Sequence, residues 1–248
     1  MLSYELTWKE IEKAGMDIAV LPIASLEQHG PHLPISTDII NAEAYASKIS
    51  KELNAFQLPT LPISTNREHM GKMGSVWMNP DTFYSMVKDI CMCLKEQGFK
   101  RIVIIQAHGG IFTLTPILRE LNATQNPGLQ VCRVEPYAFV QQFKDAGIIT
   151  SDICMHADEF ETSIVMHVRG DLVREDLIED CVPNVQREYL NYGSIFCVSP
   201  SGVWGRPSHA SAEKGKALLE MGTTLMVEYI HKTFDYMDNK KTVGYSSF

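Results

Sequence analysis

The stretch at residues 27–38, EQHGPHLPISTD, holds several side chains that can bind a proton or a metal ion. It contains Glu27, His29 and Asp38, and it follows the apolar sequence IAVLPIASL. In an extended chain, side chains two residues apart project to the same side, so Glu27 and His29 can face a common point. Carboxylate and imidazole ligands together suit Zn²⁺, Mn²⁺ or Fe²⁺. A helix cap at Asp38 and a solvated Glu27 are the structural alternatives.

Two later stretches carry residues of the same types. His108 lies in AHGG, directly after the apolar sequence RIVIIQ, and its glycines let the chain turn sharply and a ligand approach closely. The stretch HADEFETS contains His156, Glu159 and Glu161. On a helix that begins at His156, the side chains of His156 and Glu159 lie on one face, while Glu161 points elsewhere. The alternative is a solvated acidic first turn, which the helix dipole favours.

These side chains are numerous enough for a centre of two metal ions. They exceed what one tetrahedral zinc ion takes, but they suit two ions that share a bridging carboxylate. Asp38 is the best bridge, because a carboxylate has two oxygens and a histidine cannot easily bind two ions. The expected ligands are Glu27, His29, Asp38, His108 and Glu159.

An alternation of strand and helix patterns supplies the elements that would bring these loops together. Apolar stretches at 17–25, 56–64 and 101–106 are typical of buried strands, and a helical pattern follows each of them. Such alternation predicts βαβ units with a mainly parallel central sheet, which is the α/β fold class. In such sheets the loops beyond the carboxyl ends of the strands meet at one edge. We therefore expect the polar loops after the three strands to form one pocket.

The rest of the chain continues this alternation. Helical patterns cover 115–124, 156–168 and the long amphipathic sequence SAEKGKALLEMGTTLMVEYIHKTF, and LQVCRVEPY is typical of a further strand. The stretch at about 179–208 is rich in proline and glycine and has no regular pattern. No low-complexity linker or internal repeat interrupts the chain, which predicts one domain over residues 1–248.

Composition and charge exclude several classes of function. The net charge of −8, with no basic stripe, argues against a nucleic-acid partner. The N-terminal sequence lacks the pattern of a signal peptide, and no apolar stretch is long enough to span a membrane. The six cysteines are scattered, so buried thiols are expected rather than disulfides, with Cys91 and Cys93 on different helix faces. We expect a cytoplasmic protein that acts on a small molecule and binds neither nucleic acid nor a membrane.

The ordered motifs resemble those of the creatininase (creatinine amidohydrolase) family. The stretch LPIASLEQHGPHLPISTD is similar to the family's opening motif LPxGSxEQHGPHLPxxTD, QAHGG is similar to NGHGGN, and HADEFETS is similar to HAGExETS. EHMGKMGSVWMNPDTF and GVWGRPSHASAEKG resemble two further motifs of the family. The resemblance extends from about residue 4 to about residue 235. It implies a creatininase-like α/β/α fold of three layers and a homo-oligomer, which is a hexamer in that family.

The resemblance also implies two divalent metal ions, with zinc as the first expectation and manganese or iron as alternatives. In creatininase one glutamate ligand lies two residues after the histidine of the third loop, where this chain has Gly110. We expect Glu159 to supply the missing carboxylate, and Glu161 is the alternative for this ligand. The ligands carried over by position are Glu27, His29, the bridging Asp38 and His108.

The resemblance makes His156 the group that transfers a proton to the leaving group, with Glu161 as a second catalytic residue. Positions that would surround the substrate depart from the family pattern, so creatinine is not the expected substrate. Those positions are Gln106, Ala107, Ile111 and Asp158. The residues expected to contact the substrate are His69, Ser75 and Gly109.

Together these features predict a metal-dependent hydrolase. A water bridging two metals would attack the carbonyl group of a small cyclic amide, a formamide or a related substrate. Two other functions stay open. One is hydrolysis of a carbon–carbon bond in an oxidised inositol ring, and the other is binding of metal and a small molecule without turnover.

Overall fold

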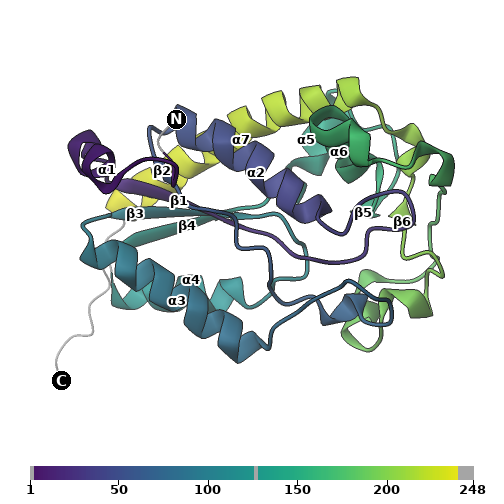
Figure 1. Cartoon of the computed structure of the whole chain (residues 1–248), viewed down its shortest axis with the longest axis horizontal. Helices are drawn as coiled ribbons and strands as arrows, with labels where there is room; N and C mark the ends of the chain where they lie inside the picture. The colour runs from purple at the N-terminus through teal and green to yellow at the C-terminus, as the bar shows by residue number, and fades with distance from the viewer. Residues whose placement is uncertain (1–2, 126–127, 240–248) are drawn as a thin grey trace.

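The structure is a computed structural model that describes residues 3–125 and 128–239. Figure 1 shows a central sheet between two layers of helices. Helices α2, α6 and α7 cover one face of the sheet, and α3 and α4 cover the other. The helices are α1 (Trp8–Ala14), α2 (Thr37–Glu52), α3 (Pro80–Glu96), α4 (Leu114–Thr124), α5 (Val140–Asp145), α6 (Glu159–Arg169) and α7 (Ala212–Asn239).

The sheet has four parallel strands in the order β2-β1-β3-β4. At its centre β1 (Ile18–Ile23) and β3 (Arg101–Gln106) pair along their whole length. They are flanked by β2 (Phe56–Gln57) and β4 (Gln130–Val134). The parallel sheet and its two helical layers confirm the predicted α/β/α fold class.

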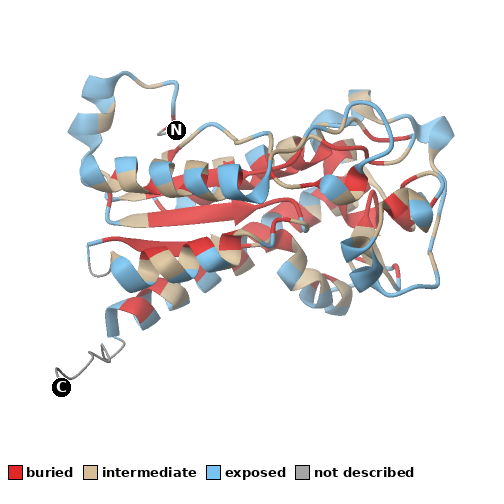
Figure 2. Ribbon diagram, turned by 90° about the horizontal axis from the view of Figure 1, so that it is seen from below, coloured by how far each residue is buried: buried red, intermediate tan, exposed pale blue. Residues whose placement is uncertain are grey.

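The central strands are apolar on both sides because helices cover both faces of the sheet. Val20 of β1 packs in the core formed with α2, α6 and α7, whereas Leu21 and Ile23 pack against α3 and α4. Figure 2 shows the sheet buried and the outer sides of the helices exposed. Because helices bury both faces of the sheet, the ends of its strands are held in place, and the polar loops project from these ends.

The second predicted strand is much shorter than the apolar pattern at 56–64 indicated. Only Phe56–Gln57 forms β2, and Leu61 adds a single parallel bridge to Ile23. Prolines at 59 and 62 lack the N–H that a continuous ladder needs, which accounts for the early end.

The stretch that contains His156 is also built differently from the prediction. His156 ends β5 (Cys154–His156), which pairs with β6 (Trp204–Gly205), and helix α6 begins only at Glu159. Between them Ala157 has a left-handed φ of 49°, which turns the chain sharply. His156 and Glu159 therefore do not share a helix face, and that prediction was wrong.

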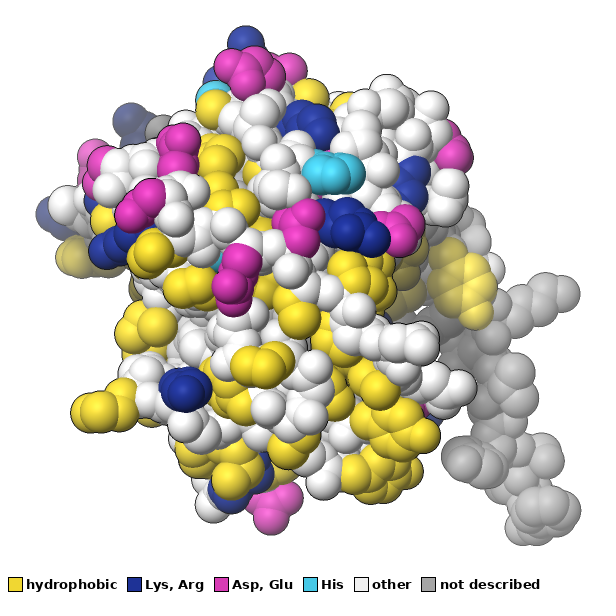
Figure 3. All heavy atoms as spheres, turned by 90° about the vertical axis from the view of Figure 1, so that its right-hand side faces the viewer, with side chains coloured by type: hydrophobic (Ala, Val, Ile, Leu, Met, Phe, Trp, Pro, Cys, Tyr) yellow, Lys and Arg dark blue, Asp and Glu magenta, His cyan; other side chains and the backbone are white. Residues whose placement is uncertain are grey.

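Figure 3 shows the end of the molecule near β5 and β6, where hydrophobic side chains lie among charged ones. All six cysteines are free, and Cys91 is buried while Cys93 is exposed, as their spacing predicted. Within the described part of the chain, no helix is long and apolar enough to cross a membrane.

Candidate metal centre and active site

The loops after β1, β2 and β3 meet beyond the carboxyl ends of these strands. Glu27 lies in the loop after β1, His69 ends the short 3₁₀ helix Arg67–His69 in the loop after β2, and His108 follows β3. His69 Nε2 and His108 Nδ1 lie 3.2 and 3.1 Å from the same oxygen, Glu27 Oε1. The parallel order of the strands thus brings together side chains that are distant in sequence.

Asp38 lies between two histidines that come from different loops. It is the second residue of α2, and its side chain does not cap that helix. Its Oδ1 lies 3.3 Å from His29 Nε2, and its Oδ2 lies 3.4 Å from His108 Nδ1. All three side chains are buried. One carboxylate therefore presents one oxygen toward each histidine, which is the geometry that a bridging ligand needs.

Glu161 completes the group on the His29 side. Its Oε1 lies 3.4 Å from His29 Nε2 and accepts a hydrogen bond from the Tyr137 hydroxyl. Its Oε2 accepts the backbone N–H of Ala157, so the left-handed turn before α6 holds the carboxylate in place. Ligand atoms of His29, Asp38 and Glu161 all lie within 4.8 Å of one another.

The structure does not bring Glu159 to this cluster. Its carboxylate forms an ion pair with Lys214 and accepts the backbone N–H groups of Thr150 and Ser151 at 3.1 and 2.7 Å. The side chain is fully buried, and it points toward the start of α7 because α6 begins at Glu159 itself. Glu159, the expected fifth ligand, therefore lies apart from the other expected ligands, whereas Glu161, the alternative, lies beside His29 and Asp38.

The cluster leaves acidic oxygens without donors, which fits a site for cations. Glu27 Oε1 and Oε2 and Asp38 Oδ2 are buried and accept no hydrogen bond from the described residues. His108 Nδ1 lies near Glu27 Oε1 and Asp38 Oδ2, but the directions do not suit hydrogen bonds. Buried carboxylates are normally paired or hydrogen-bonded, and oxygen and imidazole donors together suit divalent transition metals.

Burial and neighbouring charges shift the pKa values of Glu27 and Asp38 in opposite directions. Burial raises the pKa of Glu27 above its usual value, even though His108 lies beside it. Burial alone would also raise the pKa of Asp38, but His29 and His108 hold that pKa well below its usual range. Without cations, acidic groups packed so closely repel one another and are costly to keep charged.

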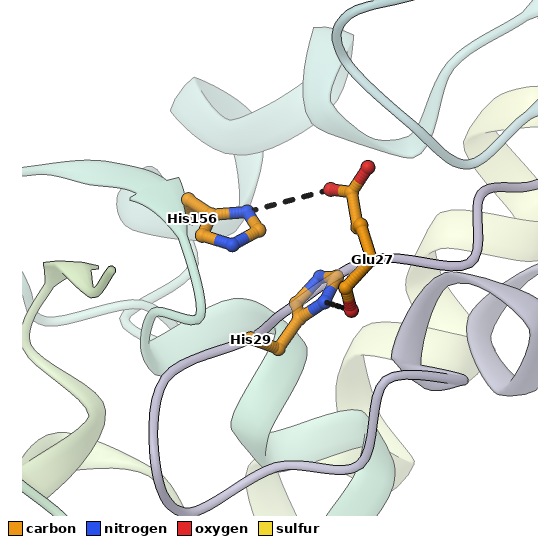
Figure 4. A group of neighbouring side chains, drawn as sticks. All are labelled: Glu27, His29 and His156. Atoms are coloured by element: carbon orange, nitrogen blue, oxygen red, sulfur yellow. Dashed lines mark hydrogen bonds and ion pairs between the residues drawn. The ribbon is translucent and has the colours of Figure 1, made fainter. Parts of the chain in front are cut away.

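His156 lies beside Glu27 and His29, as Figure 4 shows. Its Nε2–H donates to the backbone oxygen of Gln28 at 2.8 Å, and its Nδ1 lies 3.8 Å from Glu27 Oε1. Burial, together with the neighbouring His29, lowers the pKa of His156 to about 3. The ring is therefore neutral near pH 7, and its free nitrogen faces the acidic cluster.

The sequence model of the creatininase family, described as creatinine amidohydrolase, matches residues 4–230. The chain belongs to the creatininase family. The predicted family and the predicted enzyme class, a hydrolase of the creatininase type, are confirmed.

Curated relatives in this family act on different substrates. The chain is 27% identical to creatinine amidohydrolase of Pseudomonas putida, over 93% of this chain and 96% of that protein. It is 24% identical to the mycofactocin precursor peptide peptidase of Mycobacterium ulcerans (strain Agy99), over 80% and 78%. It is 21% identical to the 3-dehydro-scyllo-inosose hydrolase of Thermotoga maritima, over 92% and 80%.

Solved creatininase structures share the fold. The crystal structure of creatinine amidohydrolase superposes with a TM-score of 0.80 at 25% identity, covering 94% of this chain and 98% of that chain. A creatininase structure described with Mn gives a TM-score of 0.80 at 26% identity, with the same coverage.

As in other α/β enzymes, the site opens into a cavity at the carboxyl ends of the strands. The cavity has a volume of about 420 Å³, and His108, His156 and Glu161 line it. Ile111, Phe112 and Trp204 contribute apolar walls, and Arg133 and Arg187 contribute charged ones. A cavity of this size suits a small polar molecule with an apolar part.

The three residues expected to contact substrate have different positions in this creatininase-family site. His69 and Gly109 line the cavity, and the Gly109 carbonyl accepts a hydrogen bond from Arg187 at 2.9 Å. Ser75 Oγ accepts the backbone N–H of Gln28 at 3.0 Å and does not line the cavity. Ser75, expected to contact substrate, therefore lies outside the cavity and supports the loop that carries Glu27 and His29.

Sequence reasoning missed several residues of the site, among them Tyr137 and Trp204. Tyr137 contacts Glu161, and it follows β4 at the same edge of the sheet as the other loops. Its position after a predicted strand was the signal that could have identified it. Trp204 lines the cavity from β6, inside the stretch without a regular secondary-structure pattern. It lies in the motif GVWGRPSHASAEKG, and that motif was the signal that could have identified it.

Proposed function

We propose that this chain is an amidohydrolase that uses two divalent cations bridged by Asp38. His29, Asp38 and Glu161 would hold one ion, and Glu27, Asp38 and His108 would hold the other. The observation that carries the proposal is the pair of 3.3 and 3.4 Å distances from the two oxygens of Asp38 to histidines on opposite sides. The buried acidic oxygens without donors support it.

The bound cations would lower the pKa of a water held between them and polarise the substrate carbonyl. The donor set of oxygens and imidazoles suits zinc, manganese and iron. Zinc is the first candidate, and the other two are alternatives. The similarity to a creatininase structure described with Mn supports a divalent ion of this class.

His156 is the proposed proton carrier. In amide hydrolysis, water adds to the carbonyl carbon, the C–N bond breaks, and the leaving nitrogen takes up a proton. His156 Nε2–H is held by the Gln28 carbonyl, so Nδ1 is the nitrogen that can accept the proton lost by water and pass it to the leaving nitrogen. Such a positioned acid–base group contributes about 10²–10⁴-fold to the rate.

The proposed substrates are small cyclic amides, formamides or related carbonyl compounds other than creatinine. Hydrolysis of a carbon–carbon bond in an oxidised inositol ring is the second candidate, supported by similarity to the inosose hydrolase over most of both chains. The products distinguish the two. Hydrolysis of a C–N bond frees an amino group or ammonia, with formate as the second product of a formamide, whereas ring opening of a cyclic diketone gives a keto acid without any freed nitrogen.

The test is metal content measured together with turnover. Metal-free protein should regain two ions per chain on addition of Zn²⁺, Mn²⁺ or Fe²⁺, and it should then hydrolyse members of a panel of cyclic amides and formamides. Asp38→Ala should lose both the metal and the turnover, while the exposed control Asp89→Asn should keep both. Retention of two tightly bound ions by Asp38→Ala would contradict the proposal.

A further inference from the structure

Glu68 contacts His108 on the side of the ring that faces away from the acidic cluster. Its Oε1 lies 3.3 Å from His108 Nε2, while His108 Nδ1 lies 3.1 Å from Glu27 Oε1 and 3.4 Å from Asp38 Oδ2. The imidazole ring is therefore placed between two sets of carboxylates. The first set is Glu27 and Asp38, which lie on the Nδ1 side of the ring, and the second is Glu68 alone on the Nε2 side.

This arrangement determines which nitrogen of His108 carries the proton. A neutral ring whose Nδ1 binds a cation must carry its hydrogen on Nε2, and Nε2–H can then donate to Glu68. A carboxylate behind a metal-binding histidine fixes the ring orientation and increases the basicity of the ligand nitrogen. Glu68 is placed for this task, because its side chain is mostly buried against the ring.

Gly110 leaves the space that the Glu68 carboxylate occupies. A Cβ atom on residue 110 would lie 1.8 Å from Glu68 Oε1 and 2.4 Å from His108 Nε2. Both distances are far below van der Waals contact, so no side chain fits there while Glu68 holds the ring. Gly110 and Glu68 come from different loops, yet their positions depend on each other.

A direct metal-binding role for Glu68 does not fit the geometry. Its oxygens belong to none of the clusters of described residues whose ligand atoms lie within 4.8 Å of one another. The His108 ring separates its carboxylate from Asp38 and Glu27.

We propose that Glu68 is a positioning residue that orients His108 for metal binding, and that Gly110 is required to make room for it. This inference rests on the proposed function, because it concerns the ion held by Glu27, Asp38 and His108. Among the described residues, Glu68 forms its ion pair with His108 and none with His29, Asp38 or Glu161, which would hold the other ion. Loss of Glu68 should therefore weaken the binding of one ion and leave that of the other nearly unchanged.

The experiment titrates metal-free protein with Zn²⁺ in competition with a chromophoric chelator, which resolves two dissociation constants. Glu68→Ala should raise one of them about 10–100-fold, the usual effect of losing a group behind a metal ligand. Glu68→Gln should lose less Zn²⁺ affinity than Glu68→Ala, because its amide oxygen can still accept the Nε2–H of His108. The circular dichroism and melting temperature of the metal-free variants should match those of the wild-type protein.

The identity of the weakened ion can be measured directly. In a Glu161→Gln background the remaining ion is the one on the His108 side, so adding Glu68→Ala should weaken that single ion by the same factor. Glu188→Ala is the matched charge control, because Glu188 is exposed and lines an outer cavity together with Glu68. It should leave both constants unchanged.

Gly110→Ala tests whether the Glu68 carboxylate needs the space that Gly110 leaves. It should weaken the same ion, and its effect should be smaller in a Glu68→Ala background, because one of the two overlaps is then removed. Equal weakening of both ions, an equal effect of Glu188→Ala, or unchanged affinity in Glu68→Ala would overturn the inference while leaving the proposed function intact. Absence of stoichiometric metal in the wild-type protein would overturn both.

Discussion

The first turn of α6 carries two buried glutamates that face different surroundings. Glu159 points toward the start of α7, where Lys214 and two backbone N–H groups supply donors to its carboxylate. Glu161 accepts hydrogen bonds from the Tyr137 hydroxyl and the Ala157 N–H, but it faces the acidic cluster, in which Glu27 and Asp38 have oxygens that accept no hydrogen bond from the described residues. A buried carboxylate with its own donors is complete as it stands, whereas a group of carboxylates short of donors needs cations.

The comparison shows that residue type and burial do not separate structural from functional carboxylates. Both glutamates are almost fully buried, and they lie two residues apart. Their ion-pair partners separate them: Glu159 pairs with Lys214 of α7, and Glu161 pairs with His29 of the loop after β1. Variants of Glu161 should therefore lose metal binding and activity, whereas variants of Glu159 or its partner Lys214 should lose stability.

The largest difference is expected from replacing each glutamate with glutamine. Glu161→Gln should lose the ion on the His29 side and with it about 10³-fold or more in kcat, since a Lewis acid contributes several kcal/mol to the transition state. Glu159→Gln should keep two ions per chain and most of the activity at low temperature. Metal analysis and steady-state kinetics of the two variants check this. Loss of metal in Glu159→Gln alone would reverse the comparison.

The sequence predicted the edge of the sheet at which the site forms, because that follows from local patterns. RIVIIQ forms β3 over its full predicted length, and the parallel strands bring the loops of Glu27 and His108 into contact. The choice between Glu159 and Glu161 depends on where α6 begins. That start is set by the turn at Ala157 and by Asp158, whose side chain caps the helix by accepting the Glu161 N–H. The partner that separates Glu159 from the cluster, Lys214, comes from a distant helix and does not follow from local pattern.

A smaller effect, on stability rather than metal binding, is expected from Lys214→Met. Removing the cation leaves the buried Glu159 carboxylate unpaired, which should lower the free energy of unfolding by about 3–5 kcal/mol. The decrease should lie toward the lower end of this range, because Lys214 is 24% exposed and water can reach its side of the pair. Urea unfolding followed by circular dichroism measures the change.

Two further variants show whether the loss in Lys214→Met comes from the unpaired charge. Lys232→Met in the same helix removes an exposed partner of Glu228, and it should cost less than about 1 kcal/mol. Adding Glu159→Gln to Lys214→Met should recover part of the stability, because no buried charge remains. If the double variant is less stable than Lys214→Met, the carboxylate is not the cause.

The smallest expected effect is a change in the pH dependence of stability. Burial alone would raise the pKa of Glu159, but Lys214 and the N–H groups of Thr150 and Ser151 hold that pKa below its usual value. A carboxyl group with a lowered pKa in the folded state stabilises the protein above the pKa of the unfolded chain, about 4.3, and this contribution is lost as the pH falls through the folded value.

The free energy of unfolding of the wild-type protein and of Lys214→Met/Glu159→Gln should therefore differ by a constant amount above about pH 5, and the wild-type advantage should shrink below about pH 4.3. Urea titrations across this range measure both proteins under the same conditions. Metal release in acid affects both proteins equally, because the ligand cluster is the same in each, so it cancels in the difference. A difference that stays constant down to pH 3 would mean that Glu159 does not stabilise the fold through its charge, and the contrast with Glu161 would then rest on metal binding alone.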